Sequence, residues 1–192
     1  MIDNLLTPEA LTGLRQFCLA SSSWRDAYED GYLGAFPHHG FAPPLLAQIA
    51  EELRAIYPAI IENYPLIHFW AFKYDSQLRG IRKHADFAAV NINFWITPDT
   101  ANRDSSSGGM VIYDVPAPQS WNFREYNGNP KRVYEFLRSR DAGQRKIAYK
   151  CNRAVLFNSN LFHETDRFDF KDGYENHRIN ITYLFGRGLK AA

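Results

Sequence analysis

Apolar residues in the first third of the chain recur at the spacing of an α-helix. Thr7 and Pro8 offer a helix cap and a first-turn proline, and a stripe of apolar residues follows them to about residue 17. A second stripe starts after Pro44. Its members are Leu46, Ile49, Leu53, Ile56 and Ile60. The pattern predicts two helices, the second of which packs against a sheet.

From Pro65 onward the period of the pattern changes to two. In residues 66–74, two sets of side chains alternate, which is typical of a strand with two different faces. Turn-rich segments such as 97–99 and 105–109 then separate further apolar runs. The predicted strands cover residues 65–74, 80–87, 88–97, 109–115, 146–150, 153–158, 162–167 and 177–185.

Helices followed by a series of strands predict a mainly β (α+β) fold: a double-sheet jelly roll braced on one side by N-terminal helices. The chain has 192 residues, enough to bury the core of one domain. We therefore expect a single domain over 1–192, in which residues 1–64 form helical support and residues 65–192 form the jelly-roll core.

Residues 115–146 interrupt the series of strands as a long insertion. The insertion contains three large aromatic residues, Trp121, Phe123 and Tyr126, and a short helix is predicted around residues 132–140. The aromatic residues either cover bound substrate as a lid or form a small hydrophobic cluster beneath a long loop.

Charge excludes some classes of partner. Lysine and arginine number 22, against 21 for aspartate and glutamate, so no net field attracts nucleic acid or an anionic membrane. The first residues contain an acid at position 3 and no long apolar run, so we expect neither a signal peptide nor a membrane anchor. We expect a cytoplasmic protein whose partner is a small-molecule or peptide substrate. The sequence does not specify its oligomeric state.

His84 and Asp86 form a candidate metal site. They lie two residues apart on a predicted strand, so their side chains leave the same face. His163 follows an apolar strand and a tight turn, and it is the candidate for a third ligand. Two imidazoles and a carboxylate suit first-row transition metals and leave open positions on the ion.

A second group of polar residues is expected inside the barrel. Arg178 alternates with apolar residues on the last strand, and a buried arginine is costly unless a carboxylate meets it. Asn91 and Asn93 alternate on another strand, so they either line the pocket or face water. Arg82 shares the face of His84 and either meets substrate or is solvated. We assign Arg82, Asn91, Asn93 and Trp95 to a candidate substrate pocket.

The order of these motifs resembles that of a known family. His84-x-Asp86 is followed by Gly108-Gly109 before a strand, by residues 152–157 leading to His163, and by Arg178-Ile-Asn180. Over about residues 66–186 this series is similar to the 2-oxoglutarate- and Fe(II)-dependent dioxygenases, and most similar to their prolyl-hydroxylase-like branch.

The resemblance implies a double-stranded β-helix, a cupin-like jelly roll, in which His84, Asp86 and His163 bind Fe(II). It also implies that Arg178 pairs with the distal carboxylate of the co-substrate 2-oxoglutarate. Tyr74 and Asn180 would help to bind this co-substrate, and Arg82 and Arg187 are the alternatives to Arg178. Because the carboxylate at position 86 is present, the implied reaction is hydroxylation of a C–H bond in an amino acid, peptide or small metabolite, rather than halogenation.

Two other classes of function use the same three ligands. One is a metal-binding jelly roll that acts as a sensor or binding module without turnover. The other is a hydrolase in which zinc activates water. Neither needs a basic residue beside the metal, so Arg178 favours the oxygenase.

Overall fold

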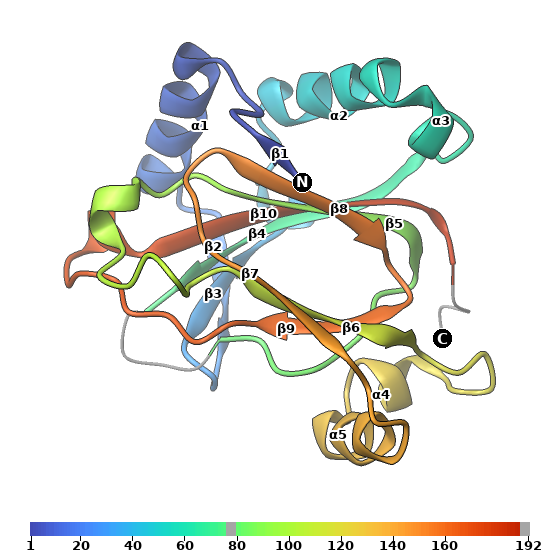
Figure 1. The fold of residues 1–192 in the computed structure, drawn as a ribbon. Helices are drawn as coiled ribbons and strands as arrows, with labels where there is room; N and C mark the ends of the chain where they lie inside the picture. Colours follow the sequence, from blue (N-terminus) through green and yellow to red (C-terminus); the bar gives the residue numbers. More distant parts are fainter. Residues whose placement is uncertain (76–79, 189–192) are drawn as a thin grey trace.

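Two antiparallel β-sheets lie face to face in the computed structural model, which describes residues 1–75 and 80–188 (Figure 1). The major sheet has the strand order β1-β8-β5-β10-β4-β3-β2 and the minor sheet the order β7-β6-β9. The strands of the major sheet are β1 (Ile2–Asp3), β2 (Trp24–Tyr28), β3 (Tyr32–Ala35), β4 (Leu66–Tyr74), β5 (Ala88–Trp95), β8 (Arg153–Asn158) and β10 (Arg178–Arg187). Those of the minor sheet are β6 (Met110–Pro116), β7 (Gln144–Ile147) and β9 (Leu161–Thr165). The predicted jelly roll is confirmed.

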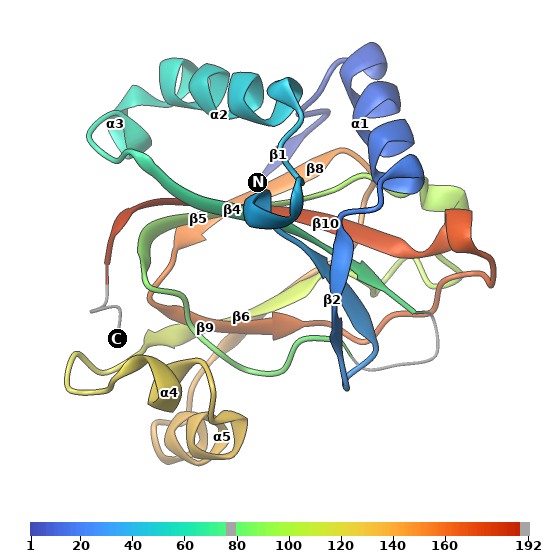
Figure 2. The ribbon, with the colours of Figure 1, turned by 180° about the vertical axis from the view of Figure 1, so that it is seen from behind.

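Helices cover the outer face of the major sheet, α1 (Pro8–Ala20) and α2 (Pro44–Ile56) lying side by side above it (Figures 1 and 2). The side chain of Thr7 accepts a hydrogen bond from the Ala10 backbone N–H and so caps α1, as expected. The second predicted stripe ends early, because Pro58 starts a separate short helix, α3 (Pro58–Ile61). Ile56 and Ile60 are consequently 64% and 47% exposed.

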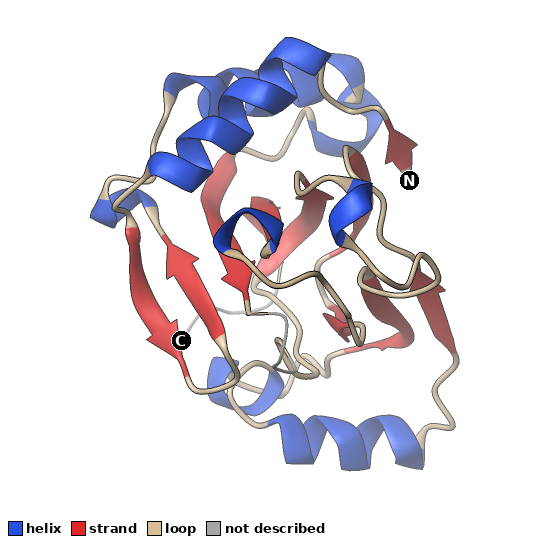
Figure 3. Cartoon of the chain, turned by 90° about the vertical axis from the view of Figure 1, so that its left-hand side faces the viewer, coloured by secondary structure: helices blue, strands red, loops and turns tan. Residues whose placement is uncertain are grey.

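The insertion lies on the opposite side of the molecule, where α4 (Phe123–Tyr126) and α5 (Pro130–Ser139) cover the minor sheet (Figure 3). Tyr126 is fully buried in a hydrophobic cluster with side chains of β6, β9 and α5, and Trp121 and Phe123 pack against that cluster. Tyr126 and its neighbours therefore form a second small core. Three short 3-10 helices complete the described elements, η1 (Pro37–His39), η2 (Asp99–Ala101) and η3 (Tyr174–Asn176).

Three of the predictions need correction. Residues 1–64 are not helical support alone, because β1 pairs with β8, and β2 and β3 extend the major sheet beyond β4. The strand expected over 80–87 is reduced to a single antiparallel bridge between His84 and His163. The strand expected over 146–150 is β7, which ends at Ile147.

The strands at the centre of the major sheet have two contrasting faces. On β10, Ile179, Ile181 and Tyr183 point toward the helices, whereas Arg178 and Asn180 belong to the other face, which looks toward the minor sheet. All ten residues of β10 except the last are buried. Polar side chains are thus placed between the two sheets.

None of the helices in residues 1–75 and 80–188 is long and apolar enough to cross a membrane.

Candidate active site

His84, Asp86 and His163 meet between the sheets. His163 lies on β9, and the backbone of His84 exchanges two hydrogen bonds with it, with N···O distances of 3.0 and 2.8 Å. His84 Nε2 lies 3.8 Å from Asp86 Oδ1, and His163 Nε2 lies 3.5 Å from Asp86 Oδ2. The side chains are only 12%, 7% and 5% exposed, in the order His84, Asp86, His163. The structure therefore brings together all three predicted ligands.

The backbone orients both imidazole rings. His84 Nδ1 lies 2.7 Å from the Arg82 carbonyl oxygen, and His163 Nδ1 lies 3.0 Å from the Leu161 carbonyl oxygen. A carbonyl oxygen only accepts, so each Nδ1 carries a proton, and each Nε2 is turned toward Asp86. Metal-binding histidines are commonly held in this way by a second hydrogen bond.

The electrostatics of the group suit a divalent cation. Burial and the neighbouring His163 lower the pKa of His84 to about 4, so its ring is neutral at pH 7. Burial alone would raise the pKa of Asp86, but the hydrogen bond with His163, the adjacent imidazoles and Asn91 together lower it. Two imidazole nitrogens and one carboxylate form a donor set that fits Fe(II) and other first-row ions.

Two side-chain amides contact the Asp86 carboxylate. Asn91 Nδ2 donates to Oδ2 at 2.7 Å, and Asn127 Nδ2 lies 3.4 Å from Oδ1 and 2.9 Å from the Ala85 carbonyl oxygen. Asn91 is fully buried, so it neither faces water nor lines the pocket. Asn127 lies just after α4 in the insertion, and it was missed because nothing in its local sequence links it to Asp86.

Arg178 lies in the same space as the three candidate ligands and is 2% exposed. Its Nε donates to the Gly108 carbonyl oxygen at 2.5 Å and its Nη2 to that of Gly109 at 3.0 Å. The guanidinium carbon lies 4.6 Å from the Tyr74 ring centroid and 5.7 Å from that of Trp95. The ion pairs formed by residues 1–75 and 80–188 do not include Arg178.

A pocket between the sheets joins these two groups. It is lined by both histidines, Asp86 and Arg178 together with other predicted residues, namely Tyr74, Asn93, Trp95 and Asn180. Sequence reasoning missed Thr165, which lies two residues after His163 on β9, also lines the pocket and has its Oγ1 3.5 Å from the Tyr74 hydroxyl. The period-two spacing from His163 was the signal that could have found it.

A larger cavity of about 380 Å³ adjoins the pocket. His84, Asp86 and Trp70 line both spaces. Phe72 and Ile81 also line both spaces, and the other walls of the cavity include the aromatic side chains of Tyr28, Tyr32, Phe36, His68, Phe87 and Phe123. Arg82 lies at this cavity and forms an ion pair with Asp30 at 2.5 Å, while Arg187 is exposed at the end of β10. Arg178 is thus the candidate arginine that shares a pocket with Tyr74.

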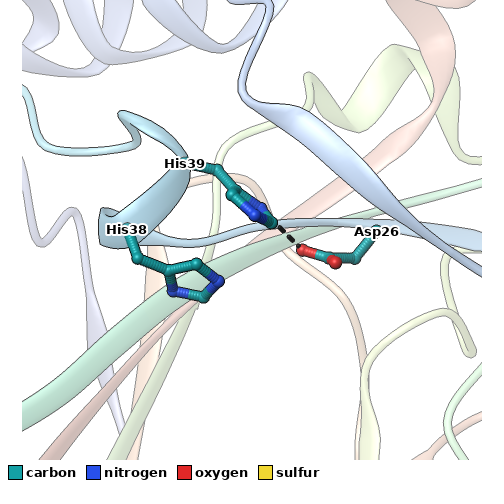
Figure 4. Close-up of side chains that lie close together, drawn as sticks. All are labelled: Asp26, His38 and His39. Carbon is teal, nitrogen blue, oxygen red and sulfur yellow. Dashed lines mark hydrogen bonds and ion pairs between the residues drawn. The ribbon is translucent and has the colours of Figure 1, made fainter.

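A second group of potential metal ligands lies at the surface (Figure 4). His39 Nδ1 and Asp26 Oδ2 are 3.1 Å apart, and their side chains are 29% and 35% exposed. His38 is exposed and extends from the same 3-10 helix, η1. This group is a hydrogen-bonded surface pair, His39 and Asp26, with a neighbouring histidine.

The fold has known counterparts. The structure is similar to HygX from Streptomyces hygroscopicus with nickel and 2-oxoglutarate bound, with a TM-score of 0.63 and 13% sequence identity over 99% of this chain and 83% of that one. It is also similar to a prolyl-4-hydroxylase from Pseudomonas putida, with a TM-score of 0.56 and 14% identity over 97% and 91% of the two chains. The fold is that of the 2-oxoglutarate- and Fe(II)-dependent oxygenases.

A third similar structure is the collagen prolyl hydroxylase of Paramecium bursaria Chlorella virus-1 in complex with 2-oxoglutarate, with a TM-score of 0.56 and 12% identity over 98% and 94% of the two chains. The predicted double-stranded β-helix is therefore confirmed by its structural counterparts as well as by its topology. No protein-family model matches the sequence, and no curated protein matches it.

Proposed function

We propose that the protein is a 2-oxoglutarate- and Fe(II)-dependent dioxygenase that hydroxylates a C–H bond of an amino acid, peptide or small metabolite. The observation that carries the proposal is the buried Arg178 in the same pocket as two histidines and a carboxylate. A buried guanidinium without a carboxylate partner is costly, and an anionic co-substrate removes that cost. A zinc hydrolase or a binding module gives no reason for this arginine.

His84, Asp86 and His163 would hold the Fe(II) ion through His84 Nε2, His163 Nε2 and an oxygen of Asp86. When bound, Fe(II) together with 2-oxoglutarate supplies the oxidising chemistry. The contribution of the chain is to keep the His84 imidazole neutral, to exclude water from a buried site and to hold the ligand atoms in place. The two backbone carbonyls that accept from the Nδ1 atoms perform the last of these tasks.

Arg178 would bind the distal carboxylate of 2-oxoglutarate. A guanidinium recognises a carboxylate through parallel hydrogen bonds, which fix both distance and direction. The carbonyls of Gly108 and Gly109 already hold the guanidinium plane, so little side-chain entropy is lost when the co-substrate arrives. The hydroxyls of Tyr74 and Thr165 and the amide of Asn180 provide further polar atoms at this end of the pocket.

The larger aromatic cavity would receive the substrate, because it opens onto His84 and Asp86 from the side away from Arg178. A volume of about 380 Å³ fits a small molecule or one or two residues of a peptide. HygX, one of the structural counterparts, has been crystallised with hygromycin B bound, so the fold accommodates a small-molecule substrate. Arg82 and Asp30 lie at this cavity and would contact polar parts of the substrate.

The test is an anaerobic titration with Fe(II) and 2-oxoglutarate, monitored by visible absorption. The expected result is a weak charge-transfer band from the iron and 2-oxoglutarate chelate that disappears in His84→Ala. The matched control is the double variant His38→Ala, His39→Ala, which removes the surface group and is expected to leave the band unchanged. If the protein as isolated binds the metal but shows no band with 2-oxoglutarate, the dioxygenase proposal is wrong.

The substrate class is tested separately. Amino acids, peptides and small metabolites are screened for succinate formation above the uncoupled background, and hits are examined by mass spectrometry for a gain of one oxygen. A product with one added oxygen supports hydroxylation, whereas a substrate-dependent rise in succinate with a loss of two hydrogens points to a different oxidative outcome.

A further inference from the structure

An unbroken chain of hydrogen bonds connects Arg178 to Asp86. Arg178 Nη1 donates to Asn180 Oδ1 at 3.3 Å, and Asn180 Nδ2 donates to Asn93 Oδ1 at 3.1 Å. Asn93 Nδ2 then donates to Asn91 Oδ1 at 2.6 Å, and Asn91 Nδ2 donates to Asp86 Oδ2 at 2.7 Å. The chain thus runs from the candidate carboxylate-binding residue to a candidate metal ligand.

The two ends of the chain determine the direction of every hydrogen bond in it. Arg178 only donates, and the ionised Asp86 only accepts. A reversed amide at Asn91 would place its oxygen against the carboxylate, and a reversed amide at Asn180 or Asn93 would bring like groups together. The three amides therefore have one consistent orientation, in which each turns an N–H group toward Asp86.

The chain is buried over its whole length. The three asparagines are at most 9% exposed, and Arg178 and Asp86 are 2% and 5% exposed. Polar groups in the centre of a sheet confer little net stability compared with well-packed apolar residues, and they are costly when their partners are lost. Packing alone therefore does not account for three consecutive amides on the inner face of β5 and β10, whereas a requirement to orient the groups at the ends of the chain does.

The contacts of the Asp86 carboxylate indicate which residue holds it in position. Asn91 lies at 2.7 Å from Oδ2, well within hydrogen-bonding distance, while the nearest amide to Oδ1 is that of Asn127 at 3.4 Å. Asn91 itself is held by Asn93, whose Oδ1 also accepts from Thr182 Oγ1 at 2.9 Å. Of the two amide contacts to the carboxylate, the one that Asn91 makes to Oδ2 is thus the shorter, and Asn91 is itself held in place by Asn93.

We propose that Asn91 is a positioning residue that fixes the Asp86 carboxylate for metal binding, and that Asn93 and Asn180 support it from the Arg178 side. This inference rests on the proposed function, because it assumes that Asp86 is a metal ligand. Asn91 is not one of the three candidate ligands and does not line the pocket between the sheets. It acts through Asp86, so its loss weakens metal binding without removing a ligand.

The test uses Co(II) alone, whose visible absorption reports both its affinity and its coordination. Asn91→Leu removes the amide at similar volume, and the expected result is a 10- to 100-fold weaker affinity for Co(II), the range seen for residues that hold a metal ligand, with a changed absorption spectrum. Asn93→Leu is expected to weaken binding in the same direction but less. Thr182→Val is the matched control: it removes a hydrogen bond to Asn93 but leaves the path to Asp86 intact, so we expect a change of less than about 3-fold.

The outcomes separate this inference from the proposed function. If the unaltered protein binds Co(II) and shows the charge-transfer band with Fe(II) and 2-oxoglutarate, but Asn91→Leu has the same Co(II) affinity and spectrum, the positioning role is wrong and the proposed function stands. If the unaltered protein does not bind Co(II) through His84, Asp86 and His163, the proposed function fails, and the inference fails with it.

Folding is checked by circular dichroism and thermal unfolding. A purely structural role for Asn91 would lower the melting temperature and leave the Co(II) spectrum of the folded fraction unchanged, which would also overturn the inference. Asn91→Ser is the second variant if Asn91→Leu does not fold. Its shorter hydroxyl side chain cannot bridge from Asn93 to Asp86, so the same loss of Co(II) affinity is expected.

Discussion

His163 Nε2 lies 3.5 Å from Asp86 Oδ2, although the two residues belong to distant parts of the chain. Because the two side chains are close enough to hold one ion, we expect each of them to be needed for metal binding. Asp86→Ala leaves two imidazoles without a carboxylate, and we expect its affinity for Fe(II) or Co(II) to fall more than about 100-fold. Isothermal titration calorimetry under anaerobic conditions measures the change. Retention of the original affinity in Asp86→Ala would exclude the site as assigned.

Substitution of Arg178 is expected to weaken the binding of 2-oxoglutarate. Arg178→Gln removes charge-assisted hydrogen bonds of about 1.5–3 kcal/mol each, so we expect at least a 100-fold weaker affinity for 2-oxoglutarate while Co(II) still binds. The readout is a titration of the charge-transfer band with 2-oxoglutarate. Arg187→Gln is the matched control, because Arg187 is exposed at the end of the same strand. If Arg187→Gln weakens 2-oxoglutarate binding more than Arg178→Gln, the assignment of Arg178 is wrong.

The close approach of Gly109 to β7 predicts a large loss of stability on substitution. A Cβ atom at this position would lie 2.0 Å from the Ile147 carbonyl oxygen, and a backbone oxygen cannot move aside without displacing the strand. We expect Gly109→Ala to lower the free energy of unfolding by about 1–3 kcal/mol or more. It also disturbs a carbonyl that holds Arg178, so 2-oxoglutarate binding weakens in parallel.

Gly13→Ala is the control for that comparison. Gly13 lies within α1, where an added Cβ would meet nothing within 4 Å. Alanine favours a helix over glycine by about 0.5–1 kcal/mol, so we expect Gly13→Ala to stabilise the protein. Urea unfolding of both variants gives the two values. Equal effects at the two positions would contradict the close packing of Gly109 against β7.

The buried Lys73 is expected to make the free energy of unfolding depend on pH. Its side chain is 1% exposed and its Nζ contacts the rings of Trp24 and Tyr174, and burial lowers its pKa from 10.5 to about 8. Between pH 8 and 10.5 the unfolded chain therefore binds more protons at this residue than the folded protein does, so its contribution to stability rises with pH. The destabilisation caused by burying the charged Lys73 side chain is fully present below pH 8 and disappears as the pH rises toward 10.5.

The variant Lys73→Met isolates this effect, because cysteines and tyrosines titrate in the same range in both proteins. The free energy of unfolding of the unaltered protein minus that of Lys73→Met should increase between pH 8 and 10.5, with a slope of at most about 1.4 kcal/mol per pH unit. Urea unfolding at several pH values provides the measurement. A difference that is flat or decreasing over this range contradicts a lowered pKa for Lys73.

The central strands of the fold were predictable because the alternation of polar and apolar residues along them is visible in the sequence. On β10, polar and apolar side chains alternate from Arg178 to Tyr183, so the strand and the side of the sheet to which Arg178 belongs follow from the sequence alone. The proximity of the three candidate ligands was also predictable, although the reasoning for His84 and Asp86 was only partly right. They lie on a segment with one bridge to β9 instead of a complete strand, and that bridge is enough to orient both side chains.

Features that depend on distant contacts were not predictable. The strands β2 and β3 form a hairpin at the edge of the major sheet, where five residues of β2 are all at least partly exposed and show no apolar alternation. Asn127 reaches Asp86 from the insertion, and Asn91 was expected in the pocket or in water because its partner is known only when the chain folds. A periodic pattern reveals the face of an element, but not which buried polar group it meets.

The two halves of the candidate metal site differ in how they are attached to the protein. His163 is built into β9, whereas residues 81–87 form one bridge, between His84 and His163, and otherwise make single backbone hydrogen bonds, such as those from Ala85 to Tyr126 and from Asp86 to Ser159. Segments with few backbone hydrogen bonds open locally at a lower free energy than the central strands of a sheet. Amide hydrogen exchange should therefore be fastest at the His84 half and slowest along β10. If the site binds an ion as proposed, local opening of residues 81–87 would give the ion a route in and out while the strand that carries Arg178 stays folded.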